Sequence, residues 1–102
     1  MTPMRTATSL LLSILLFPNV ERAQAGDLSE VLAQCAACHG VDGIAKSADV
    51  PHLAGQQELY LFNQIKAFRS GARPHKEMRF MSRQLSDAEM REIARHYAAM
   101  RR

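Results

Sequence analysis

Five consecutive residues, Cys35-Ala36-Ala37-Cys38-His39, constrain this chain more than any other feature of its sequence. The pattern C-x-x-C-H is typical of covalent haem attachment, in which each cysteine adds across one vinyl group of the porphyrin. The imidazole of the next residue then lies under the iron, and imidazole is a common axial ligand of haem iron. The motif therefore predicts that Cys35 and Cys38 hold one haem covalently and that His39 is an axial ligand of its iron.

Residues 1–25 have the pattern of a secretory signal peptide. Arg5 supplies a positive charge, an apolar run follows over residues 7–17, and Ala23-Gln24-Ala25 matches the small-x-small rule for cleavage. An uncleaved membrane anchor is the alternative, but the run is shorter than the ~20 apolar residues that a membrane-spanning helix needs. We therefore predict one small domain over residues 26–102, exported to the periplasm, with no stable membrane insertion after cleavage.

A domain of this size has a marginal hydrophobic core, and a buried haem would supply apolar surface around which helices can pack. A disulfide between Cys35 and Cys38 is the simpler alternative in an oxidising compartment. Such a bridge would close a very short loop, so it would constrain the unfolded chain little. The haem interpretation therefore accounts better for the two cysteines.

Hydrophobic periodicity predicts an all-α domain with about three main helices wrapped around the haem. The first helix covers about residues 28–36 and has Asp27 as its N-cap. The second covers about residues 57–70, and the third follows a capping box that begins at Ser86. Residues 72–84 are expected to be irregular or partly helical. The core-facing stripe of the last helix consists of Met90, Ile93, Ala94, Tyr97 and Ala98.

Four strings along the chain resemble the class I cytochromes c, in particular short bacterial monohaem proteins and single domains of dihaem ones. In order they are CAACHG, PHLAGQ, YLFNQIKAFRSGAR and MRFMSRQLSDAEM, at residues 35–40, 51–56, 60–73 and 78–90. The resemblance covers nearly the whole of the predicted domain. It implies a cytochrome c fold, one covalent haem c with its iron, and one-electron transfer rather than enzymatic catalysis.

The resemblance also implies that a methionine is the second axial ligand, a pairing with histidine that raises the reduction potential. In this family the ligand commonly lies seven residues before the leucine or aromatic residue that precedes the last helix. Met78 lies seven residues before Leu85 and is the predicted ligand. Met81 and His75 remain alternatives. Packing roles in the last helix are expected for Met90 and Met100.

In such proteins the carbonyl of a proline twelve residues after the histidine accepts the second imidazole N–H, and Pro51 has this spacing from His39. Leu53 is then expected to pack against the haem face. The first helix lacks the glycine that the family often places against the aromatic of the last helix, here Tyr97, so a looser helix crossing is expected. Further candidates near the haem are Gln57, Tyr60, Arg69 and Arg73, of which either arginine would offset the charge of a propionate. Ordinary surface positions are the alternative for both arginines.

Charge is unevenly divided along the domain. Residues 26–65 contain one base and five acids, whereas residues 66–102 contain ten bases and four acids. The basic cluster Lys76, Arg79 and Arg83 is expected to meet redox partner proteins that have an acidic docking surface. Ordinary solvated helix faces are the alternative. Nucleic acid is not among the expected partners.

Four other functions are alternatives to that of a free electron carrier. The chain could be the cytochrome subunit of a periplasmic dehydrogenase, for example a flavoprotein that oxidises sulfur compounds. A thiol–disulfide oxidoreductase needs a βαβ context, and a structural zinc site needs four ligands where Cys35, Cys38 and His39 supply three. A haem enzyme or gas sensor needs an open position on the iron, which a bound Met78 would fill.

Overall fold

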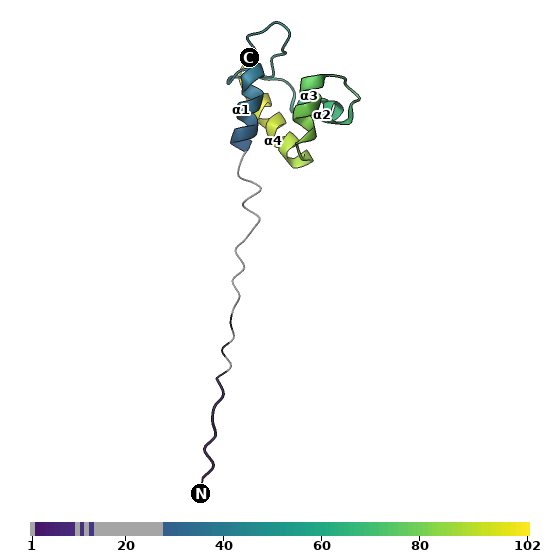
Figure 1. Ribbon diagram of the computed structural model, residues 1–102. Coiled ribbons are helices and arrows are strands. Elements are labelled where there is room, and N and C mark those ends of the chain that lie inside the picture. Colours follow the sequence, from purple (N-terminus) through teal and green to yellow (C-terminus); the bar gives the residue numbers. More distant parts are fainter. Residues whose placement is uncertain (1, 10, 12, 14–27) are drawn as a thin grey trace.

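Four helices make up the described part of the domain. The computed structural model describes residues 2–9, 11, 13 and 28–102. Residues 2–9, 11 and 13 form no helix or strand. Within residues 28–102 the helices are α1 (Leu28–His39), α2 (Glu58–Ser70), α3 (Lys76–Arg83) and α4 (Asp87–Ala98), with no strand among them (Figure 1). The predicted all-α class is confirmed. The proposed cleavage motif Ala23-Gln24-Ala25 and the predicted N-cap Asp27 lie outside the described residues.

A fourth helix, α3, occupies residues 76–83 within the segment 72–84 that was expected to be irregular or partly helical. This short helix begins after His75, whose Nδ1 accepts a hydrogen bond from the Met78 backbone N–H at 3.2 Å. Its buried position is taken by Ser82, a polar residue. None of the four described helices combines the length and apolarity needed to cross a bilayer.

The four helices pack in a single series. α4 contacts both α1 and α2, and α3 contacts α2, whereas α1 contacts neither α2 nor α3 (Figure 1). The buried cluster consists of Leu61 from α2 and of Ile93, Ala94 and Tyr97 from α4. Partly buried residues of α1 complete it from the other side. The core is therefore centred on α4, and α1 and α3 lie at the two ends of the series.

Local capping sets where α4 begins. The Ser86 side chain accepts a hydrogen bond from the Glu89 N–H at 3.1 Å, and the Glu89 carboxylate accepts one from the Ser86 N–H at 3.0 Å. This is the capping box that the sequence predicts. The apolar stripe of the same helix is also as predicted, with Met90 fully buried at 0% exposure.

Arg69, expected near a haem propionate, instead joins α2 to the start of α4. Its guanidinium donates to the Asp87 carboxylate at 2.6 Å and to the Leu85 carbonyl at 3.2 Å. The hydrogen bond from Arg69 lowers the pKa of the Asp87 carboxyl. Arg73 also has protein partners, since it donates to the Gln64 side chain at 2.7 Å and lies over the Phe68 ring. Arg69 therefore links α2 to the start of α4, whereas Arg73 makes its contacts with residues of α2.

Candidate haem-binding site

The three residues of the C-x-x-C-H motif share one face of α1. The helix runs through the motif to His39, three residues further than predicted, so Cys35, Cys38 and His39 stand at i, i+3 and i+4. Residues at these spacings lie above one another on a helix surface. Both thiols are free, with Cys35 half-buried and Cys38 exposed, while His39 is only 7% exposed. α1 therefore presents two sulfur atoms and one imidazole on the same side.

A backbone carbonyl fixes the His39 ring. The Nδ1 atom of His39 lies 2.8 Å from the carbonyl oxygen of Pro51. A carbonyl can only accept a hydrogen bond, so Nδ1 carries the proton and Nε2 keeps its lone pair. This is the arrangement that orients an imidazole as a metal ligand and raises its basicity. The predicted contact between His39 and Pro51 is confirmed.

The loop over residues 40–56 is folded tightly enough to hold Pro51 in place. The Gly43 carbonyl accepts hydrogen bonds from the Leu53 N–H at 2.8 Å and the Ala54 N–H at 3.0 Å. The Ala45 N–H donates to Nδ1 of His52 at 2.8 Å. This role of His52 could not be predicted from the sequence, because only the folding of the loop brings His52 close to Ala45. The imidazole of His39 is therefore positioned by a closed loop that follows it directly.

The two methionines that precede α4 lie on the inward face of α3. Met78 and Met81 are half-buried and lie on the same side of the helix as the buried Ser82, with Met78 nearer to it. His75, an alternative ligand at the sequence level, uses Nδ1 to cap this helix. The packing role expected for Met90 agrees with its burial in α4. Met100 also packs against the core, but it follows the end of α4 rather than lying within the last helix.

This donor set fits a covalently held haem. One face of α1 offers two thiols and an imidazole whose free nitrogen is available to iron, and α3 offers thioether sulfur. α1 and α3 do not contact one another, so the two sources of axial ligands belong to separate elements. Among the described residues, no three His, Cys, Asp or Glu side chains converge on a point suited to a metal ion.

Tyr97 of α4 packs against the cysteine side of α1. It is 2% exposed, and Cys35 is among the partly buried residues packed against the cluster that contains it. Burial raises the pKa of the Cys35 thiol. Burial, and then the proximity of Cys35, raises the pKa of Tyr97 to about 12. The folded protein therefore favours the neutral form of the tyrosine.

The raised pKa of Tyr97 predicts a loss of stability in alkali. In the unfolded chain Tyr97 ionises near the ordinary pKa of 10, whereas in the folded protein it stays neutral to higher pH. The free energy of unfolding therefore keeps the full contribution of this group below pH 10 and loses it as the pH rises toward about 12. We expect the wild-type melting temperature to fall faster than that of Tyr97→Phe over this range. Melting followed by circular dichroism at several pH values measures the difference. Parallel curves for the two proteins would contradict this role of the hydroxyl.

Comparison with known proteins gives consistent matches. A family model described as Cytochrome c matches residues 27–97. Cytochrome c4 of Pseudomonas aeruginosa is 39% identical over 69 residues, which cover 68% of this chain and 34% of that protein. A "Thiosulfate dehydrogenase electron acceptor" of Stutzerimonas stutzeri is 39% identical over 70 residues, covering 66% and 32%. Cytochrome c-554(548) of Halomonas halodenitrificans is 38% identical over 80 residues, covering 76% and 94%. The chain thus spans about a third of the length of the first two relatives and nearly all of the third.

Proposed function

Because the chain belongs to the cytochrome c family, we propose that it is a one-electron carrier that uses a covalently held haem c and that it is not an enzyme. The four helices have the all-α cytochrome c fold that the resemblance implied. The observation that carries the proposal is the 2.8 Å hydrogen bond between His39 and the Pro51 carbonyl. It prepares one imidazole nitrogen for iron directly beside the two attachment cysteines.

We assign the thioether bonds to Cys35 and Cys38 and the axial positions to His39 and Met78. The assignment is supported by the shared face of α1 and by the inward direction of Met78 on α3. A haem iron with these two axial ligands supplies one-electron exchange between Fe(III) and Fe(II). Because His39 and Met78 would fill both axial positions, the chain leaves no position on the metal for a substrate.

Export to the periplasm is part of the same proposal. Residues 1–25 would be removed as a signal peptide, leaving one domain over residues 26–102. Support comes from Arg5, the apolar run that follows it, and the small-x-small motif that ends at Ala25. The carrier would then exchange electrons with redox proteins of that compartment, and the excess of bases after residue 65 favours partners with an acidic docking surface.

A second candidate role is that of cytochrome subunit in a periplasmic dehydrogenase, such as a flavoprotein that oxidises sulfur compounds. The likeness to proteins named as electron acceptors of thiosulfate dehydrogenase favours a dehydrogenase of sulfur compounds as the electron donor, and it fits a free acceptor as well as a bound subunit. A free carrier would purify from its native host alone. A subunit would purify with a larger protein and would leave it only under dissociating conditions.

The visible spectrum of the exported protein tests the haem assignment. We expect the wild type, made in a host able to mature c-type cytochromes, to keep its haem through denaturing extraction and to give a sharp reduced c-type spectrum. Replacing both Cys35 and Cys38 with alanine should release all of the colour, because no covalent bond would remain. A colourless wild-type protein would overturn the proposal.

A further inference from the structure

A histidine outside the proposed ligand set lies in the loop that orients His39. The Nδ1 atom of His52 accepts a hydrogen bond from the Ala45 N–H at 2.8 Å, across seven positions of the chain. A backbone N–H can only donate, so Nδ1 keeps its lone pair and the neutral ring carries its proton on Nε2. Ala45 is 8% exposed, so water has little access to replace this acceptor. The Ala45 N–H therefore depends on the His52 ring for its hydrogen bond.

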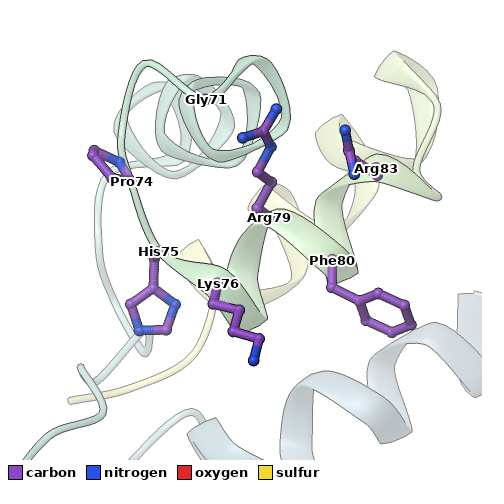
Figure 2. A pocket seen from close by; sticks show the side chains of 7 residues that line it. All are labelled: Gly71, Pro74, His75, Lys76, Arg79, Phe80 and Arg83. Carbon is purple, nitrogen blue, oxygen red and sulfur yellow. The ribbon is translucent and has the colours of Figure 1, made fainter.

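His75 uses the same atom for a different purpose. Its Nδ1 accepts the Met78 N–H at 3.2 Å, only three positions away, and Figure 2 shows this histidine at the start of α3. That bond is a local helix cap. The His52 bond instead ties together two stretches of a loop. Removing the acceptor of His52 would therefore change the shape of the loop rather than the end of a helix.

The Ala45–His52 bond is the nearest to Pro51 of the hydrogen bonds that join the two sides of this loop. Two hydrogen bonds to the Gly43 carbonyl close the base of the loop. In the described part of the chain, the single hydrogen bond of residues 46–50 joins two of their own members. Pro51 has no N–H to donate. The adjacent residue His52 is therefore the closest point at which the loop fixes the Pro51 peptide.

The position of the Pro51 carbonyl bears on the electron density of the His39 ring. Its oxygen lies 2.8 Å from Nδ1 of His39. A strong hydrogen bond from this N–H makes the imidazole a more basic ligand. A more basic axial ligand stabilises Fe(III) relative to Fe(II) and so lowers the reduction potential. If the carbonyl moves away, the hydrogen bond weakens and the potential rises.

We propose that His52 is a positioning residue for the iron ligand His39. By accepting the Ala45 N–H, it keeps the Pro51 carbonyl on the His39 ring and so lowers the reduction potential of the haem. This inference rests on the proposed electron-transfer function. It assigns a redox role to a side chain that acts on the ligand through the backbone of the loop.

Two substitutions of similar size test the role of the Nδ1 acceptor. In His52→Asn the amide oxygen is attached to Cγ, as Nδ1 is in histidine, so it can accept the same hydrogen bond. In His52→Leu a methyl group takes that place and leaves the Ala45 N–H without its acceptor. Both new side chains are uncharged, so charge at this position cannot cause a difference between the two variants.

The measurements use the haem-loaded proteins. By redox titration we expect the equilibrium of His52→Leu to shift about threefold toward the reduced form, a rise of roughly 30 mV for one electron. In the reduced protein, proton NMR should show the His39 Nδ1–H exchanging with deuterated water about tenfold faster, because its hydrogen bond opens more often. His52→Asn should match the wild type in both measurements.

Other results would overturn the inference. Equal shifts in both variants would mean that the imidazole ring matters rather than its acceptor atom. A lower melting temperature of His52→Leu, with unchanged potential and exchange, would mean that His52 only stabilises the loop. If His52→Leu takes up no haem, His52→Gln replaces it, since its amide oxygen lies one carbon too far from the backbone; a wild-type potential would then overturn the inference. A wild type without covalent haem would instead refute the proposed function before any variant is compared.

Discussion

Replacing Met78 with alanine should leave the haem attached and abolish the weak methionine–iron charge-transfer band of the oxidised protein. The two thioether bonds and His39 do not depend on this side chain, so the colour is expected to survive denaturing extraction. The reduction potential should fall by roughly 0.1 V or more, a fraction of the ~0.8 V over which axial ligands tune haem. The band is read from the visible spectrum and the potential from a redox titration.

Met81→Ala is the matched control for this variant. Met81 lies three residues along the same inward face of α3 and is buried to a similar degree, so its loss removes a comparable volume from the core. We expect the band and the potential to change little. The reverse result would assign the ligand to Met81. Survival of the band in both variants would show that neither methionine of α3 is the axial ligand.

Gly40→Ala is expected to be the most damaging glycine substitution in the loop that holds the histidine. Gly40 ends α1 with φ +85°, and a Cβ built on it would lie 2.2 Å from the carbonyl oxygen of Ile44. Two costs therefore add. An alanine in the left-handed region costs about 1–2 kcal/mol, and the loop backbone that leads to Pro51 must also shift. We expect a total loss of more than ~4 kcal/mol in the free energy of unfolding.

Gly71→Ala separates these two costs. Gly71 has nearly the same backbone angle, φ +84°, but the nearest atom to its Cβ position is the Arg79 guanidinium carbon at 3.5 Å. Only the backbone cost of about 1–2 kcal/mol should therefore appear. Denaturant unfolding of the haem-loaded proteins gives both values. Equal losses would mean that the loop after Gly40 yields to the added methyl group at little cost.

Features governed by short-range rules could be predicted from the sequence. The capping box at Ser86 and the spacing from His39 to Pro51 depend on residues close along the chain, and both are present in the structure. The choice between Met78 and Met81 was different. It rested on a spacing typical of the family, and the structure keeps both side chains on the inward face because they are three residues apart on one helix.

Features that depend on tertiary contacts were predicted poorly. α3 is only eight residues long and is capped by a histidine, so its bounds within residues 72–84 were not evident from the sequence. Arg69 was a candidate for binding a propionate, and its pairing with Asp87 was not evident because Asp87 lies eighteen positions further along the chain. Only the packing of α2 on α4 brings these two groups together.

The proposed covalent bonds give the two iron–ligand bonds unequal durability. α1 and α3 are the two ends of the helix series, and each is packed on one other helix. The elements at such ends are the first to open in local fluctuations. If α1 opened, His39 would stay close to the iron, because Cys35 and Cys38 on the same helix would still be bonded to the haem. If α3 opened, nothing would hold Met78 near the iron, so a competing ligand would bind on the methionine side.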